Sequence, residues 1–306
     1  MDRKTWLVAL FAAELAIVAL AVQAVRGSAI WPRWSSPAPV ETTMSAPAPA
    51  SPGSTITIAL PGAALTLSPS SDGQVHLEET QAKGGWWWGG DPKRRVIHID
   101  PAFGGMRIWR DALFAVGYKE GTDKVALAVP PGSRINVTAA ETITAAGFRN
   151  ALTLHAVEGP VYVRDQHGDL NVSSESGRIV LDETEANRIA LSTRDGRLIG
   201  TRVSMRGPAP RLDATTTDGR VEMQMKQLPR DGQYMVHTGS GRMRLELPSD
   251  SNVTVTMRTG DGDISATGVA LTGQGKERRA VFGDGAAAFD LSTGDGRIEL
   301  TSGSSE

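Results

Sequence analysis

The sequence predicts an all-β protein built mainly as a single-chain β-solenoid, a parallel β-helix-like stack of coils of about 20 residues each. A short phrase of apolar residues, Ser or Thr, Asp or Ser, Gly, and Arg or Asp recurs down the second half of the chain. Such self-similarity is typical of stacked repeats. Apolar residues alternate at period two on both sides of each phrase, as in strands that bury one face. The chain of 306 residues has 34 glycines and only 5% aromatic residues, which suits a narrow aliphatic core with many corners.

Residues 1–27 are predicted to form an N-terminal membrane anchor or signal segment. After MDRK the chain continues with an apolar stretch of about twenty residues, long enough to cross a bilayer core of about 30 Å. Arg3 and Lys4 favour an N-terminus inside the cell. The protein is then expected to be a single-pass protein of a bacterial cell membrane, with the solenoid outside the cytoplasm. Signal cleavage after Ala24 is the alternative, and it would make the protein secreted.

Two further regions follow the apolar segment. Residues 28–53 are rich in Pro, Ser and Ala, so they cannot bury a core and should form an extended, semi-stiff linker. Residues 54–302 are expected to form the solenoid repeat domain.

Each copy of the repeated phrase is centred on one glycine. We predict structural turns at Gly177, Gly196, Gly219, Gly241, Gly262 and Gly296. The bend there is expected to need the positive φ that costs glycine little. The Ser or Thr three residues earlier should face inward and satisfy backbone groups of the turn. Each coil buries about four aliphatic side chains at about 1.5 to 3 kcal/mol apiece, and chain ordering consumes most of that gain. Only a stack should be stable.

The spacing of these glycines favours coils over hairpins. Successive intervals of 19, 23, 22 and 21 residues fit one coil each, whereas the last interval of 34 residues predicts an inserted loop that starts at Gly268. A run of antiparallel hairpins closed by Asp-Gly turns is the alternative, because it has the same local signal. Truncation before Phe289 should expose a raw strand edge and promote aggregation.

Composition excludes several classes of function. The net charge of −2 excludes a nucleic-acid-binding protein that works by bulk positive charge. The chain has no cysteine, which rules out thiolate catalysis and Cys-bound zinc. Its five histidines show no ligand spacing, so no metal is expected. The Asp residues at the corners are expected to serve turns, since calcium-binding solenoids repeat every nine residues or so. We predict no catalytic residue and no cofactor, because no nucleophile elbow or phosphate loop stands out.

A run of three tryptophans between glycine pairs is the most unusual local feature, and it comprises Trp86, Trp87 and Trp88. Three adjacent indoles cannot all point into a thin core, so we expect at least one to stack on sugar rings or to rest at a membrane interface. A flap folded over one end of the solenoid is the alternative. The basic run that follows, Lys93, Arg94 and Arg95, could reinforce a membrane or anionic-polymer contact.

An arginine follows most of the corner glycines. These residues are Arg178, Arg197, Arg220, Arg242 and Arg297, and they should line one edge about 4.8 Å apart. Such a stripe could bind an anionic glycan or a lipid headgroup. The interpretation favoured by the neighbouring Asp residues is a solvated, charge-compensated edge that blocks aggregation.

The repeat and three longer stretches resemble the "putative adhesin" β-strand-repeat family of bacterial envelope proteins, a domain-of-unknown-function group. The stretches are LAVPPGSRINV from Leu127, ELPSDSNVTVTMRTGDGDI from Glu246 and FDLSTGDGRIEL from Phe289. The resemblance covers residues 55–302 or so. It implies the repeat fold and an anchored or secreted protein, and it supplies no catalytic residues.

We therefore expect a non-enzymatic, membrane-tethered, extracytoplasmic solenoid that presents a surface for adhesion or envelope organisation. Its expected partners are the membrane, an envelope glycan or anionic polymer, and further copies of itself, without nucleic acid. One alternative is a polysaccharide-acting β-helix enzyme, which needs two or more acids converging in a cleft. Another is a scaffold or sensor subunit that pairs through its strand edges with itself or with a membrane protein.

Overall fold

The computed structural model describes residues 42–44, 48–49, 53–80, 85–86, 97–102, 104–110, 118–119, 123–139 and 141–303. All regular structure in these ranges is β, and no helix in them is long and apolar enough to cross a bilayer. The predicted membrane segment and most of the predicted linker lie outside the described residues.

Within the described ranges the strands form two large sheets and one small one. The first sheet contains β1 (Thr42–Met44), β2 (Ala48–Pro49), β4 (Ala63–Pro69), β5 (Gln74–Thr80), β10 (Asp123–Val129), β12 (Thr142–Ala146), β14 (Val161–His167), β16 (Ile179–Ala186), β18 (Leu198–Met205), β20 (Val221–Gln227), β22 (Met243–Pro248), β24 (Ile264–Thr267) and β27 (Ile298–Gly303). The second sheet contains β3 (Thr55–Ala59), β7 (His98–Ala102), β8 (Gly105–Trp109), β11 (Arg134–Ala139), β13 (Leu152–Ala156), β15 (Leu170–Ser174), β17 (Arg188–Thr193), β19 (Arg211–Asp218), β21 (Gln233–Ser240), β23 (Val253–Thr259), β25 (Glu277–Phe282) and β26 (Ala287–Asp295). The small sheet pairs β6 (Gly85–Trp86) with β9 (Tyr118–Lys119).

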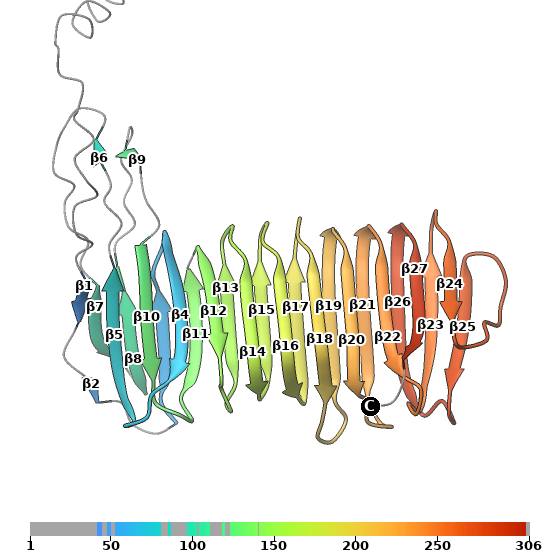
Figure 1. The fold of residues 1–306 in the computed structure, drawn as a ribbon, viewed down its shortest axis with the longest axis horizontal. Helices are drawn as coiled ribbons and strands as arrows, with labels where there is room; N and C mark the ends of the chain where they lie inside the picture. Colours follow the sequence, from blue (N-terminus) through green and yellow to red (C-terminus); the bar gives the residue numbers. More distant parts are fainter. Residues whose placement is uncertain are drawn as a thin grey trace, which may run out of the picture. The chain divides into compact units, whose positions relative to one another are not determined.

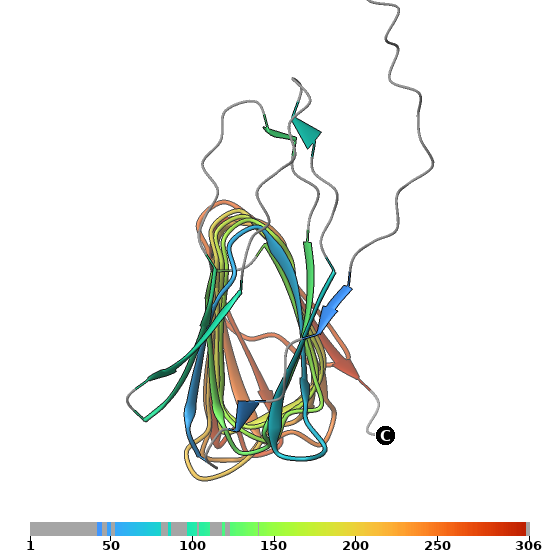
Figure 2. The same cartoon turned by 90° about the vertical axis from the view of Figure 1, so that its left-hand side faces the viewer.

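Through the middle of the chain the strands alternate between the two large sheets, so one strand from each makes a coil (Figure 1). Each strand pairs in parallel with the strand two elements further on, as β14 does with β16 and β16 with β18. Viewed along the stack, the coils superimpose as a flattened loop with the sheets as its two long walls (Figure 2). Parallel pairing of successive units confirms stacked coils in this region and excludes the hairpin alternative there.

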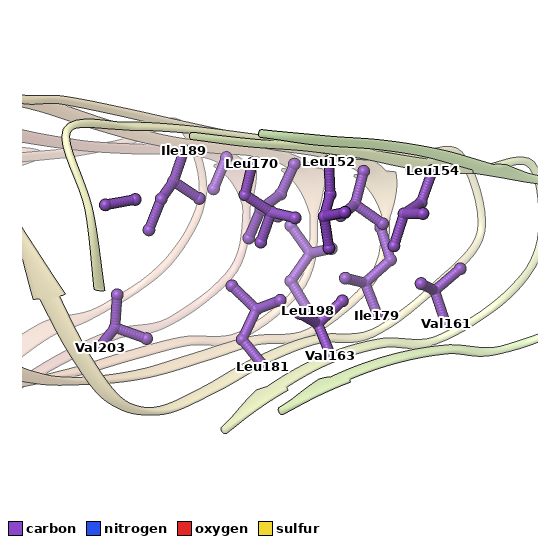
Figure 3. Packing of buried hydrophobic residues seen from close by; sticks show 14 of the residues in the cluster. Leu152, Leu154, Val161, Val163, Leu170, Ile179, Leu181, Ile189, Leu198 and Val203 are labelled. Carbon is purple, nitrogen blue, oxygen red and sulfur yellow. The ribbon is translucent and has the colours of Figure 1, made fainter. Parts of the chain in front are cut away.

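The core lies between the two walls. Inward residues of the second sheet, such as Leu170 and Ile189, face inward residues of the first, such as Ile179 and Leu198 (Figure 3). All four are 2% exposed or less. The side chains predicted from period-two alternation to face inward are buried along the repeats. Ile264, two residues after Gly262, is half-buried. The prediction of the buried face is therefore confirmed.

The C-terminal coil does not lie at the end of the stack. Strand β26 pairs with β21 on one side and with β23 on the other, and β27 lies between β22 and β24. The first coil of the repeat region is placed in the same way, with β3 between β8 and β11 and β4 between β10 and β12. The first coil of the repeat region and the C-terminal coil therefore each lie between two other coils. Those two coils come from neighbouring parts of the sequence.

Antiparallel strands cover the outermost coils. At the N-terminal end, β5 pairs antiparallel with β10, and β7 with β8. At the other end, β25 pairs antiparallel with β23. Ala280 and Phe282 of β25 are buried, and Val269 and Leu271 pack against the core. The insertion after Gly268 is therefore an end cap with a strand of its own rather than a simple loop.

Candidate functional site

The repeat phrase forms the corner at which the chain passes from the second sheet to the first. Buried hydroxyl groups join successive coils at this corner. The Ser or Thr three residues before each glycine is at most 5% exposed. Its hydroxyl donates a hydrogen bond to the carbonyl oxygen of a glycine in the adjacent coil, as Thr193 does to Gly177 (3.2 Å) and Thr259 to Gly296 (3.0 Å). Each hydroxyl therefore ties one coil to the next, a role beyond the predicted satisfaction of its own turn.

The corner glycines are required for space rather than for a positive φ. Among the six, only Gly241 has a φ in the left-handed region. A Cβ on Gly196 or Gly219 would overlap with the carbonyl oxygen of the corner glycine in the adjacent coil. The predicted reason is therefore wrong for five of the six corners. Close backbone approach, the other circumstance that demands glycine, replaces it.

The five corner arginines lie in consecutive coils of the stack. Backbone hydrogen bonds fix their register, because Ile179 N donates to Arg197 O (2.8 Å) and Met243 N donates to Arg297 O (2.8 Å). The order along the stack is Arg178, Arg197, Arg220, Arg242 and Arg297, followed by Asp263 in the outermost corner. All five guanidinium-bearing side chains are exposed. We call this row the arginine ladder.

Charge compensation changes along the arginine ladder. Arg297 lies 3.8 Å from both Asp263 and Glu299, and Arg242 lies 4.0 Å from Glu299. At the other end of the ladder, Arg178 and Arg197 form no ion pair with any described residue. The predicted compensated edge therefore describes the C-terminal part of the ladder and not its N-terminal part.

A groove of about 480 Å³ lies over the part of the ladder that contains Arg178, Arg197 and Arg220. It is lined by the arginines 178, 197 and 220, by Ser176, Asp195 and Asp218, and by two corner glycines. Gly196 and Gly219 contribute no side chain, so backbone is part of the lining. The groove thus crosses three successive coils and combines cationic donors with carboxylate and hydroxyl oxygens. We call it the corner groove.

The outer surface of the second sheet carries a further in-register row, which we call the outer row. It comprises Thr57, Asn136, Thr153, Asn171, Ala190, Asp213, Met235, Asp290 and Thr256. A hollow of about 320 Å³ opens where Ala190 is the smallest member, with Arg188 and Arg211 beside it. The outer row was not predicted, although strict alternation on each strand already implied an outward row.

Three acids of β16 in the first sheet lie in ion pairs. Arg202 reaches Asp182 at 2.8 Å and Glu183 at 3.1 Å, and Arg206 reaches Glu185 at 2.9 Å.

Asp165, Glu183 and Arg202 occupy equivalent places in three coils and have a φ between 49° and 53°. A positive φ is uncommon for residues other than glycine. No sequence signal pointed to this repeated positive φ. No group of three or more His, Cys, Asp or Glu side chains able to hold a metal occurs in the described ranges.

The tryptophan run is described only in part. Trp86 belongs to β6 and lies opposite Tyr118 of β9 in the antiparallel pair. The rest of the predicted contact residues lie outside the described ranges, namely Trp87, Trp88, Lys93, Arg94 and Arg95. Their role stays a prediction.

A buried charge cluster connects β5, β10 and the residue that follows β8. The Arg110 side chain is fully buried, 2.8 Å from Asp123 and 3.8 Å from Glu79. It also donates two hydrogen bonds to the carbonyl oxygen of Pro61 (2.7 and 3.0 Å). Glu79 belongs to β5, Arg110 follows β8 and Asp123 begins β10, so the cluster ties these three places together. Nothing in the sequence singled out Arg110.

An aromatic cluster on the β7–β8 hairpin was likewise not predicted. The Trp109 ring stacks on His98 (centroids 4.5 Å apart), and its indole nitrogen donates to Asp100 (2.6 Å). The guanidinium of Arg107 lies 5.5 Å from the Trp109 ring centroid. The four residues therefore make their contacts with one another, on a hairpin at the N-terminal end of the second sheet.

Comparisons with known proteins identify a family. The profile of the family described as Toastrack DUF4097 matches residues 69–301. A "putative adhesin" from Bacteroides fragilis has 13% identity and a TM-score of 0.38, with 86% of this chain and 97% of that chain covered. A "putative cell adhesion protein" from Clostridium sporogenes has 10% identity and a TM-score of 0.32, with 87% and 100% covered. No protein with a curated description matches the sequence.

Proposed function

The chain belongs to the Toastrack DUF4097 family, and from this premise we propose a non-enzymatic protein whose solenoid presents a surface for adhesion or envelope organisation. In this proposal residues 1–27 tether the protein to a bacterial cell membrane and the solenoid lies outside the cytoplasm. Residues 28–53 connect the two, and β1 and β2 within this range pair with β5. The apolar N-terminal stretch and the charges of Arg3 and Lys4 support that placement.

One observation carries the proposal: outward arginines repeat in register from coil to coil along the arginine ladder. Such a surface offers the same contact many times at a spacing of about 4.8 Å. Repeated contacts suit a repetitive polymer or an extended surface, because many weak contacts add up. A catalytic cleft would instead bring unlike groups together once. Asp182 and Glu185 of the first sheet are held in ion pairs with Arg202 and Arg206.

Topology is tested with the full chain in a bacterial host. The chain should fractionate with the membrane, and protease added to spheroplasts should degrade the solenoid. A variant that lacks residues 1–27 should stay in the cytoplasm and resist the added protease. Full protection of the intact chain in spheroplasts would overturn the extracytoplasmic placement.

Surface presentation is tested by incubating cells that display the full chain with isolated cell-wall fragments. Cells that express the chain should retain more fragments than cells carrying an empty vector. New reducing ends in the fragments would instead favour the polysaccharide-acting enzyme, and equal retention by both cell types would contradict the adhesive role.

A further inference from the structure

We propose that the corner groove binds a linear acidic polysaccharide whose chain runs along the stacking direction of the coils. This inference deepens the proposed function, on which it rests, by naming the ligand class and the place of binding. Three features of the groove carry it: its repeat, its uneven charge compensation and its mixture of polar groups.

The repeat provides the match to a polymer. Arg178, Arg197 and Arg220 project from equivalent positions of three consecutive coils, which lie about 4.8 Å apart. A row of guanidinium groups at this spacing can bind one anionic group per coil. Guanidinium binds carboxylate and other oxyanions through paired N–H donors. A single small anion would use one coil and leave the other arginines without a ligand.

Uneven compensation locates the binding to the groove rather than to the whole ladder. Arg178 and Arg197 have no ion-pair partner in the described part of the chain. Arg220 has only Glu222, at 3.4 Å. Arg242 and Arg297 share Glu299, and Arg297 also faces Asp263. A polyanion would have to displace these carboxylates at the far end, whereas Arg178 and Arg197 have no ion-paired carboxylate among the described residues to displace.

The mixture of groups selects a polysaccharide among polyanions. Asp195 and Asp218 line the groove between the arginines, together with Ser176. Carboxylates repel a polymer that consists only of anionic groups, such as polyphosphate, but accept hydrogen bonds from sugar hydroxyls. A neutral glycan would leave the guanidinium groups unused. A uronic acid polymer supplies both anions and hydroxyls on every residue.

The groove floor permits close approach. Gly196 and Gly219 line the groove without side chains, and the packing of the adjacent coil already requires glycine at both positions. The same constraint that closes the corner therefore keeps side chains out of this part of the lining.

The test uses the full chain in detergent micelles, with polygalacturonate as the probe. Binding is measured by biolayer interferometry against immobilised polymer, with dextran as the neutral control. The chain should bind polygalacturonate and not dextran. The double variant Arg178→Ala/Arg197→Ala should lose affinity by about tenfold or more, which corresponds to about 1.4 kcal/mol.

The matched control is Arg242→Ala/Arg297→Ala, which removes the same charge from the same ladder outside the groove. It should bind within about twofold of the unaltered chain. Equal losses in the two double variants would show unspecific attraction to positive charge and overturn the proposal. Thermal melting of both variants should match the parent, because all four side chains are exposed.

Competing ligands are separated by two further arms. Polyphosphate should bind more weakly than polygalacturonate, and Asp195→Asn/Asp218→Asn should reverse that order by removing the repulsion. The Arg178→Ala/Arg197→Ala variant should bind vesicles of phosphatidylglycerol as strongly as the parent does. Polyphosphate as the preferred ligand of the parent, or vesicle binding lost in that variant, would overturn the assignment to polysaccharide. If the protein is extracytoplasmic but does not bind polygalacturonate, this inference is wrong. The proposed function would be unaffected by that result.

Discussion

The hydroxyl of Thr193 donates a hydrogen bond to the carbonyl oxygen of Gly177 in the adjacent coil, at 3.2 Å. Equivalent bonds recur from Ser174 to Thr293. They join coils at the corner, where the chain leaves one sheet and has not yet entered the other. The corner is therefore a ladder of side-chain hydrogen bonds that continues the backbone ladders of the two sheets.

Replacing Thr193 with Val should destabilise the protein by about 1 to 2 kcal/mol, since a buried carbonyl oxygen loses its donor. Thr193→Ser keeps the hydroxyl and should cost less, as Ser174 already fills the equivalent place. Urea denaturation followed by circular dichroism measures both. A larger loss for Ser than for Val would mean that methyl packing, and not the hydrogen bond, is what the site requires.

Gly219→Ala should cost about 3 kcal/mol, because its Cβ would overlap with the carbonyl oxygen of Gly196. Gly132 is the matched control, with a φ of +86° and no atom within 4 Å of the place that a Cβ would take. Gly132→Ala should cost about 1 kcal/mol from backbone strain, and Gly132→Asn less. Tolerance of Asn at position 219 would restore the positive-φ explanation for the corners. The same denaturation assay compares the variants.

Arg110→Met should destabilise the N-terminal coils by about 3 to 5 kcal/mol, because Glu79 and Asp123 are buried opposite its charge. Hydrogen exchange across β5 and β10 should rise. The triple variant with Glu79→Leu and Asp123→Leu should regain most of the loss, since no charge is then buried. Arg107→Met, three residues earlier in β8, is the control with an exposed side chain. Unchanged exchange in Arg110→Met would mean that the cluster does not stabilise the pairing of β5 with β10.

Removal of residues 287–306 takes out an inner coil, and so its effect differs from the simple exposure of an end. Strands β23 and β24 lose their partners β26 and β27, and we expect 253–282 to lose hydrogen-exchange protection as one unit. A chain that ends at Gly303 is the control and should retain it. Persistent protection of β23 in the truncated chain would contradict the observed strand order.

Burial raises the pKa of the Tyr234 phenol well above its usual range, and the charge of Asp231 adds to the shift. A group whose folded pKa is raised contributes stability that is fully present below its unfolded pKa of about 10 and is lost as pH rises beyond that value. The melting temperature should therefore fall between pH 9 and pH 11. Tyr234→Phe removes the titrating group, so its decline over this range should be smaller. Parallel declines would mean that other groups cause the alkaline loss.

Much of the fold was predictable from the sequence because the signals are local. Alternation around Leu191 and Leu198 assigns the inward face, and the glycine spacing gives the coil length. The position of Arg197 after its glycine was enough to place it in an outward row. The Trp86 segment and residues 1–27 carry predictions that the described residues do not test.

The remaining features depend on contacts between segments far apart in the chain. Arg110 is one arginine in a stretch without a motif, and only the fold brings it to Asp123 and Glu79. The uneven charge compensation of the arginine ladder was equally hidden, since Glu299 follows its partner Arg242 by 57 residues in the sequence. Sequence reasoning consequently treated all five ladder arginines as equivalent.

The sequence by itself determined the coil, its buried face, its corners and the outward ladder, because each follows from alternation and from glycine placement within about twenty residues. Tertiary structure alone decided the order in which coils stack at the two ends. Every coil offers neighbours the same aliphatic rows and the same narrow corner, so local pattern cannot say which coil pairs with which. The cap formed by β25, and the clamping of β26 and β27 between earlier coils, decide it.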